Sequence, residues 1–504
     1  TTNLIPSDRN LKVVWYKSTD TNKTTPLADG SQIDNGDIIT ADAGCKDETL
    51  YTDMSDFDDD NKNELMYGGN TPSASGAEYS FRCSDGALAA EGTPGTKACN
   101  GYIPAHILYA ATGTNDGIVI NSSTSSSYNN GGVNDCAIDW GDNTASVCLN
   151  GNNPHAYSSA GDYHIRIYGE KFTGFCFYNS ATYCGSDAAA NSNYKTKLKE
   201  IYSLGKWDNI TSMYYAFSNT SLNEISKNTF KYLTEVTSFY STFYNCSSLT
   251  SIPAGLFDYN TKVTSFGNAF ENCSNLASIP ADLFKKNTEV TSFSRVFDSC
   301  PKLNLIPIGF FDNNKKVTSF SYAFTGWGIE SIPANLFKVH DKVSNVTGTF
   351  RDCKNLKEIP AGLFDPANIA ELPNHTTKVT DFTQVFYGCS GLTSIPADLF
   401  KNHKNVTYFS SAFSSCSKLA SIPAGLFDEN KAVTSFSNAF ERCANLASIP
   451  ADLFKYNTAV RDFNSVFSNC TKLACSDITS ASTNWPRWNA SGVTMTDAAS
   501  KCKQ

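Results

Sequence analysis

The residues best suited to chemistry lie in an acidic segment, residues 53–64, with the sequence DMSDFDDDNKNE. Four carboxylates and one backbone carbonyl occupy positions 1, 3, 5, 7 and 9 of a loop that begins at Asp56. The residues are Asp56, Asp58, Asp60, Lys62 (through its carbonyl) and Glu64. Ca²⁺ binds six to eight oxygen ligands, and this alternation points the oxygens toward one centre. The spacing is compatible with a calcium loop, and a solvated acidic loop is at least as well supported by the sequence.

Cysteine is the second residue type with chemical potential. Eight of the 17 cysteines occupy one position of a repeat: Cys246, Cys273, Cys300, Cys353, Cys389, Cys416, Cys443 and Cys470. One Cys per repeat differs from the paired C-x₂-C pattern of zinc sites, and Trp327 stands in this position in one copy. We therefore predict a ladder of buried thiols, rather than disulfides between repeats or a metal site.

The remaining nine cysteines lie outside the repeat, at Cys45, Cys83, Cys99, Cys136, Cys148, Cys176, Cys184, Cys475 and Cys502. Close spacings such as Cys136/Cys148 indicate local disulfides and hence an oxidising compartment. We expect a Cys475/Cys502 disulfide to hold the C-terminal tail.

Several function classes are disfavoured. The six histidines are scattered without metal-ligand spacing, and no G-x-S-x-G, P-loop or dinucleotide motif occurs, so we expect no enzyme activity. The net charge is −9 without a Lys/Arg cluster, which argues against nucleic acid as a partner. No apolar stretch approaches the roughly 18–20 residues that span a bilayer.

A repeat of about 27 residues organises the second half of the chain. Residues 263–289 and 433–459 are nearly identical, and ten copies begin at Ile210, Val236, Val263, Val290, Val317, Val343, Val379, Val406, Val433 and Val460. A fixed period in this range indicates stacked supersecondary units. The sequence therefore predicts a mainly β, leucine-rich-repeat-like solenoid.

Each copy follows the pattern V-T-S-F-x-x-A-F-x-x-C-x-x-L-x-x-I-P-A-x-L-F-x-x-N. VTSF and LxxIP are interpreted as short strands, and AFxxC and ADLFxxN as single helical or 3₁₀ turns. Neither segment buries its apolar side alone, so stacked copies should place the Phe rings in three rows, each ring contributing roughly 1.5–3 kcal/mol by burial. The tail with Trp485 and Trp488 should cap the last coil.

Residues 210–474 resemble the BspA-like leucine-rich repeats of bacterial and protist surface proteins, through the alternating AFxxCxxL and LxxI segments. The copies here are a few residues longer than the usual family repeat. The resemblance implies an extracellular, non-catalytic, cell-surface protein that uses its solenoid for adhesion or contact with a protein partner. It does not identify the ligand.

Irregular positions of the repeat are the candidates for a binding face. The copy from Val343 is 36 residues long, with an insertion near residues 366–375 that ends at His375, and insertions map to loops on one face of a solenoid. The variable residues after VTSF are further candidates, at Tyr240, Arg295, Tyr322 and Gln384. An ordinary solvated surface is the alternative for both sets.

Residues 136–169 resemble a polycystic-kidney-disease (PKD) type β-sandwich, through the DWGD turn at 139–142 and the H-x-Y and G-x-Y segments at His155 and Gly161. The resemblance implies a structural role for these residues and a spacer module on a cell surface.

The acidic segment resembles the short calcium loop of integrin-type FG-GAP repeats, with Asn61 in place of the usual Gly.

These observations predict five regions: a β-rich module with the possible calcium loop (1–98), a PKD-like β-sandwich (99–172), a solenoid N-cap (173–209), the solenoid (210–474) and a C-terminal cap (475–504). The predicted function is extracellular adhesion or protein recognition. The alternative is a structural subunit of an extracellular filament, pilus-like appendage or surface layer that self-assembles. Scattered Tyr and Trp residues keep glycan as a further possible ligand.

Overall fold

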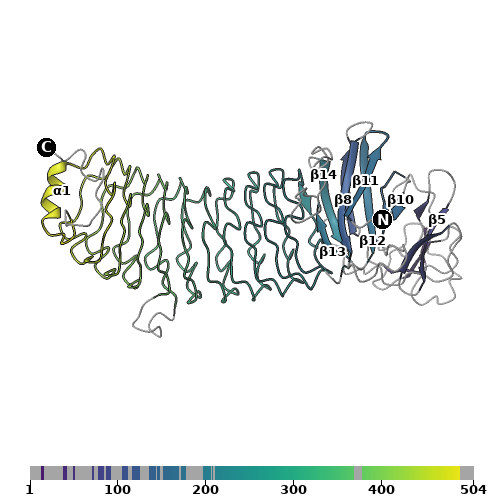
Figure 1. The fold of residues 1–504 in the computed structure, drawn as a ribbon, viewed down its shortest axis with the longest axis horizontal. Helices are drawn as coiled ribbons and strands as arrows, with labels where there is room; N and C mark the ends of the chain where they lie inside the picture. Colours follow the sequence, from purple (N-terminus) through teal and green to yellow (C-terminus); the bar gives the residue numbers. More distant parts are fainter. Residues whose placement is uncertain are drawn as a thin grey trace. The chain divides into compact units, whose positions relative to one another are not determined.

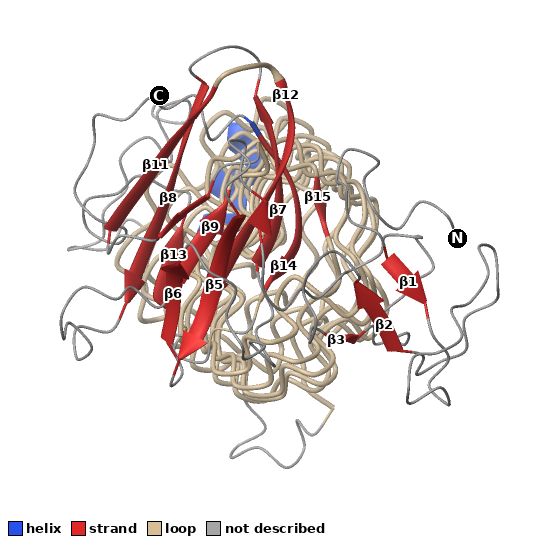
Figure 2. Ribbon diagram, turned by 90° about the vertical axis from the view of Figure 1, so that its right-hand side faces the viewer, coloured by secondary structure: helices blue, strands red, loops and turns tan. Residues whose placement is uncertain are grey.

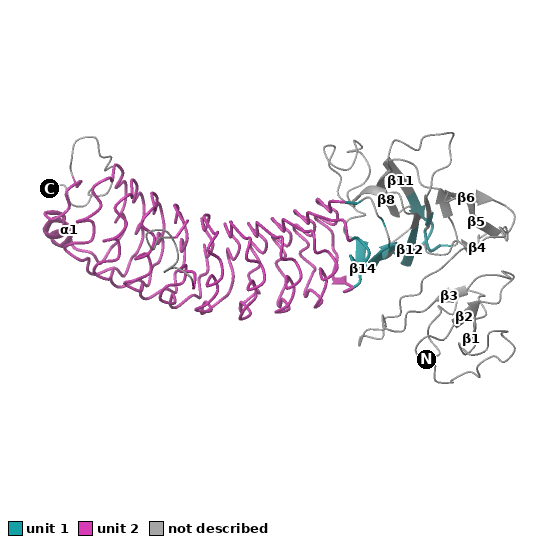
Figure 3. Cartoon of the chain, turned by 90° about the horizontal axis from the view of Figure 1, so that it is seen from below, with its two compact units in different colours: residues 1–175, 179–210, 228–233 teal, residues 176–178, 211–227, 234–504 magenta. Residues whose placement is uncertain are grey.

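The computed structural model describes residues 197–205, 207, 210–367 and 377–488, together with strands between residues 13 and 176 and the turns at residues 140–142 and 158–160. The chain divides into two compact units, shown in different colours in Figure 3. The first comprises residues 1–175, 179–210 and 228–233, and the second residues 176–178, 211–227 and 234–504. The acidic segment 53–64 and His375 lie outside the described residues.

The first unit is built from antiparallel strands. Two three-stranded sheets have the orders β1-β2-β3 and β4-β5-β6, and a third has the order β11-β8-β13. A further sheet runs β10-β9-β12-β7-β14 within this unit. The bounds are β1 Val13–Trp15, β2 Ile38–Ala41, β3 Thr49–Tyr51, β4 Thr71–Pro72, β5 Glu78–Ser84, β6 Ala87–Glu91, β7 Ala105–Ala111, β8 Asp116–Thr124, β9 Cys136–Asp139, β10 Ala145–Val147, β11 Gly151–Tyr157, β12 Gly161–Gly169, β13 Phe172–Cys176 and β14 Leu198–Leu204.

A packed turn follows β9. Trp140 stacks on His155 with ring centroids 4.7 Å apart, and Tyr157 donates a hydrogen bond from its hydroxyl to the Trp140 carbonyl at 2.9 Å. His155 Nε2 lies 2.8 Å from Asp142 Oδ2. Gly141 has a φ of +80°, and a Cβ there would lie 2.7 Å from the His164 carbonyl oxygen, so only glycine fits. These contacts give the DWGD turn a structural role.

The second unit is a row of stacked coils made almost entirely of turns (Figures 1 and 2). Its named elements are β15 (Glu224–Ile225) and helix α1 (Cys475–Ser482). Single parallel bridges link the third residue of each VTSF segment to its equivalent in the next coil, from Ser212 to Asp462. The expectation of short strands at VTSF and LxxIP was therefore wrong for most coils: pairing there is limited to isolated bridges, and only β15, in the LxxI segment of the first coil, is a named strand among the described coils.

The reason lies in the backbone hydrogen bonds that follow each bridge. The N–H groups of Phe239, Ser241, Phe243 and Asn245 each donate to a carbonyl of the next coil. Between them, the N–H groups of Thr242 and Tyr244 donate to the carbonyl three residues earlier, and that of Tyr240 donates to Ser238 Oγ. Ser241 and Asn245 have positive φ, and equivalent positions repeat this in the other coils. The chain turns continuously while every second N–H still points to the neighbouring coil, so no extended strand forms.

The predicted aromatic rows form the core. Phe239, Phe266 and Phe293 stack at centroid separations of 5.6 and 5.9 Å with nearly parallel planes, and Phe243 stacks on Phe270 at 5.1 Å. A third row includes Phe284, which stacks on its equivalents in both neighbouring coils at 6.1 Å. All these rings are fully buried.

The eight repeat cysteines are buried and free, which confirms the predicted thiol ladder. Each thiol donates to the carbonyl of a Phe in the preceding coil, as Cys300 does to Phe270 at 3.2 Å. Trp327 makes the same kind of bond, from Nε1 to Phe297 at 2.9 Å. The position therefore requires a buried hydrogen-bond donor. Cys475 is disulfide-bonded, and the Cys475/Cys502 pairing remains a prediction because Cys502 lies outside the described residues.

Candidate functional site

The variable residues of the repeat form a continuous polar strip along the second unit. We define the strip as the two residues after each VTSF segment and the two residues before each Cys position, from Tyr214 to Asn469. These positions hold only Gly, Ser, Thr, Asn, Gln, Tyr, Arg, Asp and Glu, with no Lys and no aliphatic residue. Most of them are partly exposed, while the Phe, Ala and Cys between them are buried.

A cluster of bonded side chains occupies the middle of the strip. Tyr322 donates a hydrogen bond from its hydroxyl to Gln384 Oε1 at 3.0 Å, although the two residues are separated by an intervening coil. Arg351, from that coil, donates from Nη1 to the same Gln384 oxygen at 2.9 Å. One amide oxygen therefore joins three successive coils.

Arg295 extends the cluster to a fourth coil. Its guanidinium lies 4.3 Å from the centroid of the Tyr322 ring, a cation–π arrangement, and Nη1 lies 2.6 Å from Asp298 Oδ2. Asp298 is 6% exposed and also accepts a hydrogen bond from Ser299 at 2.9 Å. Burial raises the pKa of Asp298, although Ser299 and Arg295 favour its charged form.

Arg351 repeats this arrangement. Its guanidinium lies 4.7 Å from the centroid of the Tyr387 ring, and Nε donates to Asp352 Oδ2 at 3.2 Å. We call Arg295, Asp298, Tyr322, Arg351, Asp352, Gln384 and Tyr387 the Tyr322–Gln384 cluster. Two arginines stacked on tyrosines and held by carboxylates make a preorganised surface with both charged and aromatic character.

A glycine makes the long Tyr322 contact possible. Gly348 occupies the second position after VTSF, where other coils carry a side chain, and a Cβ there would overlap the Tyr322 ring. The ring therefore lies across the intervening coil and reaches Gln384. Gly388 plays the same part for Asp352, whose carboxylate occupies the space of the absent Cβ.

Three of the five predicted binding-face residues, Arg295, Tyr322 and Gln384, come together in this cluster. Tyr240 lies nearer the start of the strip, where its ring stacks on Tyr214 at 5.0 Å. Asp298, Arg351, Asp352 and Tyr387 were not predicted from the sequence. The available signal was the Gly at position 348, which breaks the run of side chains at its repeat position.

The described residues contain no group of three or more His, Cys, Asp or Glu side chains placed to hold a metal ion. Among those same residues, no helix has the length and apolarity needed to cross a membrane. The charged groups of the cluster bond to one another, so what the arrangement offers is a contact surface. The predicted calcium ligands lie in the undescribed acidic segment, so calcium binding remains a prediction.

A family model described as "Mycoplasma protein of unknown function, DUF285" matches residues 191–283, 237–362 and 368–481. Together these matches cover more than half of the chain. The chain belongs to the DUF285 family. The DUF285 matches coincide with the coils, the polar strip and α1, whereas β1 to β13 lie outside them.

Two solved structures are similar to this DUF285 protein only at a low level, and both contain leucine-rich-repeat proteins. A chain of the Toll–Spatzle complex from Drosophila is 15% identical, with a TM-score of 0.26 over 51% of this chain and 42% of that one. A chain of the TLR13–ssRNA13 complex is also 15% identical, with a TM-score of 0.13 over 55% and 58%. Each match thus spans less than two thirds of this chain and less than two thirds of the chain it is compared with. At these TM-scores neither structure supports a functional conclusion. No curated protein matches.

Proposed function

We propose that this protein recognises another protein through the polar strip, with the Tyr322–Gln384 cluster as the centre of the contact. In this proposal the second unit is a BspA-like leucine-rich-repeat solenoid of about ten 27-residue coils. The protein acts at the cell surface in adhesion and has no enzymatic activity. The turn around Trp140 belongs to a PKD-like module that serves as a spacer.

The composition of the strip is the observation that carries the proposal. Protein-binding surfaces are enriched in Tyr and Arg and depleted of Lys, and antibody paratopes combine Tyr with Ser, Gly and Asn. Tyr and Arg occur in the strip between Tyr214 and Tyr387 and again at Arg442, Ser, Gly and Asn occur throughout it, and Lys is common elsewhere in the repeats. The second position after VTSF and the position before Cys adopt positive φ, which favours Gly and Asn; the other strip positions exclude Lys without such a backbone constraint.

Preorganisation supports the cluster as the centre of the contact. Arg295 and Arg351 are already held by carboxylates and aromatic rings in the free protein. Fewer rotamers are therefore lost on binding, which saves about 0.5–1.5 kcal/mol for each ordered side chain.

The structural-subunit alternative is less compatible with the C-terminal end of the solenoid. Trp485 contacts the ring of Phe454 at 4.9 Å, and Trp488 contacts Phe463 at 5.2 Å. The aromatic rows are thereby covered after the last coil, so a filament could not continue them through this end. Light scattering and negative-stain microscopy of the native protein test the alternative: regular filaments or sheets would support it.

The recognition proposal is tested with an array of purified extracellular matrix proteins and receptor ectodomains probed with the labelled chain. Affinities for the proteins that bind are then measured by biolayer interferometry. The quadruple variant Arg295→Ala, Tyr322→Ala, Arg351→Ala and Gln384→Ala should bind at least about tenfold more weakly, because central Tyr and Arg residues dominate interface energies.

The matched control variant is Lys262→Ala, Lys316→Ala and Lys357→Ala. These lysines form exposed ion pairs with Glu235, Glu289 and Glu330, away from the strip, and such pairs contribute little to stability. The control should bind like the wild type. Equal binding by the quadruple variant, or binding to a glycan array alone, would overturn the proposal.

A further inference from the structure

A second ladder of side chains, formed by the Asn that ends the FxxN segment, ties successive coils together. Asn287 donates from Nδ2 to two carbonyls of the preceding coil, those of Phe257 at 3.0 Å and Asn260 at 2.9 Å. Asn314, Asn430 and Asn457 make the same pair of bonds at 2.8–3.0 Å. Each of these side chains is almost completely buried.

The ladder is interrupted in three consecutive coils. His340 and His403 take the Asn position in the coils from Val317 and Val379, and Ala367 takes it in the coil between them. Both imidazoles are buried, at 3% and 0% exposure. Neither ring nitrogen of either histidine has a hydrogen-bond partner among the described residues. The Phe311 and Phe364 carbonyls, at the repeat position of the Phe acceptor in the Asn coils, still face the two imidazoles, but neither contact has the geometry of the Asn hydrogen bonds.

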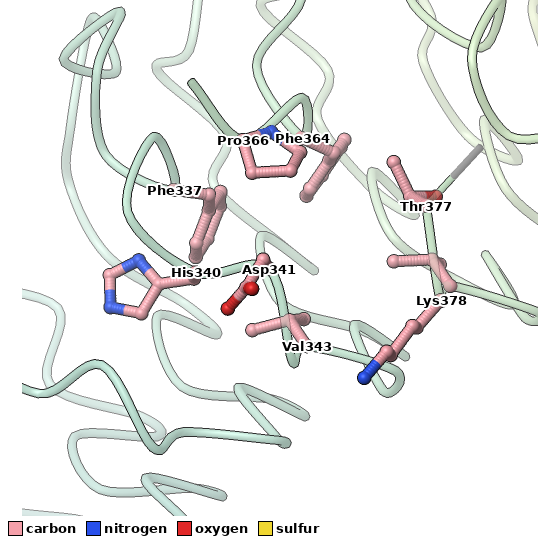
Figure 4. A pocket seen from close by; sticks show the side chains of 9 residues that line it. Phe337, His340, Asp341, Val343, Phe364, Pro366, Thr377 and Lys378 are labelled. Atoms are coloured by element: carbon pink, nitrogen blue, oxygen red, sulfur yellow. The ribbon is translucent and has the colours of Figure 1, made fainter. Parts of the chain in front are cut away.

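Other unsatisfied polar groups gather in the same place. A small hollow beside His340 is lined by Phe337, Phe364 and Thr377 (Figure 4). The Thr377 hydroxyl and Asp365 Oδ1 are also buried without a hydrogen-bond partner among the described residues. Each unsatisfied donor or acceptor weakens a packed core by about 1–3 kcal/mol. Asn287, Asn314, Asn430 and Asn457 also leave Oδ1 unsatisfied, so the His coils differ in that both ring nitrogens lack a hydrogen bond among the described residues.

The surroundings offer little to stabilise a charged His340. Asp341, in the same turn, is the carboxylate that favours protonation of His340. The Phe311 carbonyl faces the imidazole from the preceding coil, and the Phe337 carbonyl faces it from the same coil. Lys378, which lines the hollow, opposes a second positive charge there. The face of the imidazole toward Phe320 is apolar, with ring centroids 5.2 Å apart.

His403 is in a similar position. Asp365 Oδ1 lies 3.8 Å from its Nδ1, the Phe364 carbonyl also faces it, and Phe382 packs against it at 5.0 Å. Burial raises the pKa of Asp365, so this carboxylate loses charge in acid and compensates an imidazolium less.

Burial lowers the pKa of His340 to about 4 and that of His403 to about 3, from an ordinary value of 6.5. In an opened segment both would titrate near the ordinary value. Opening of the segment therefore takes up protons below pH 6.5. The segment is fully stable above that pH, and its stability is lost progressively as the pH falls toward the folded-state pKa values of the two histidines. At pH 5 the opening equilibrium rises roughly 30-fold for each histidine.

We propose that residues 317–405 form an acid-sensitive segment of the solenoid, in which protonation of His340 and His403 loosens three coils while the Asn-containing coils on either side stay folded. Tyr322, Arg351 and Gln384 belong to these same three coils. Mild acid would therefore separate Tyr322 from Gln384 and weaken partner binding, a consequence that rests on the proposed function.

The test compares the wild type with the double variant His340→Asn and His403→Asn, which restores the residue found in the other coils. Hydrogen–deuterium exchange, corrected for the intrinsic rate, is followed at pH 7.5 and pH 5 without any ligand. In the wild type, residues 317–405 should gain exchange at pH 5 by tenfold or more over the flanking coils. The double variant should lose most of this gain.

A reverse variant keeps the proposal testable if the double variant folds poorly. Asn314→His places an imidazole in the intact part of the ladder and should extend the acid-sensitive region to the coil from Val290. Uniform exchange along the solenoid at pH 5, or the same gain in the double variant, would overturn the proposal. Because no partner is used, this outcome is independent of whether the strip binds one.

Discussion

At the residue scale, Gly348 determines whether the cluster can form. Its φ of +59° is not exceptional, because Tyr322 and Gln384 adopt positive φ at the same repeat position. What distinguishes it is the Tyr322 ring lying over it. A side chain at 348 would lift the ring and break the bond between Tyr322 and Gln384.

Replacement of Gly348 by Ala should lower the free energy of unfolding by about 1–3 kcal/mol, the range for overpacking a close contact. It should also weaken partner binding. Ser411→Ala is the matched control, since Ser411 has the same backbone conformation with φ of +56°. Urea denaturation measures the free energy of unfolding of both variants. An equal loss of stability in the two variants would contradict the role assigned to Gly348.

The sequence indicated part of this site because variable residues stand out against a constant repeat. It pointed to Arg295, Tyr322 and Gln384 as separate candidates. Their meeting depends on a side chain that crosses a whole coil, which repeat spacing does not reveal. Arg351 was missed because it precedes the Cys position, whereas the predicted variable residues all follow VTSF.

At the element scale, the coil depends on buried donors at fixed positions. The thiols of the ladder are enclosed on all sides, and burial raises the pKa of Cys246 to about 11 and those of Cys273 and Cys389 further. The thiolate is the reactive form of cysteine. These residues are therefore structural donors with little reactivity in the folded protein.

N-ethylmaleimide at pH 8 should leave all eight ladder cysteines unmodified in the native protein and modify all of them in about 6 M guanidinium chloride, where the chain is unfolded. Peptide mass spectrometry distinguishes these positions from the other cysteines. Rapid native modification of Cys300 or Cys389 would contradict the buried ladder.

The repeat pattern predicted the aromatic rows but not the form of the backbone. VTSF has β-type composition, and we expected strands there. The positive-φ residues at the second position after VTSF, such as Ser241 and Asn268, bend the chain at once. Residues other than Gly rarely adopt this conformation, so the composition of the segment gave no sign of it.

At the scale of the whole molecule, a solenoid must cover the open end of its core. Helix α1 and the segment after it do this, with Trp485 buried on Phe454 and its Nε1 donating to the Ala451 carbonyl at 3.1 Å. The fixed period made the solenoid predictable. The arrangement of β1 to β13 was less so, because short strands without a repeat give weak signals.

Trp485→Ala should lower the free energy of unfolding by about 3 kcal/mol, as expected for truncating a buried aromatic side chain. It should also promote aggregation by exposing the aromatic rows. Thr479→Ala, on the exposed side of α1, should change stability by less than about 0.5 kcal/mol. Thermal unfolding monitored with light scattering measures both effects, and a stable, soluble Trp485 variant would show that the end needs no cap.

The central claim is that the polar strip, and no other surface of the coils, contacts a protein partner. Site-specific photo-crosslinking tests it most directly, with a benzophenone amino acid placed at Tyr387 in the cluster or at Tyr259, which is 51% exposed and lies outside the strip. The full chain is then applied to intact cells and irradiated. A discrete protein adduct is expected from position 387 and none from position 259. Adducts from 259 alone, or equal yields from both positions, would contradict it.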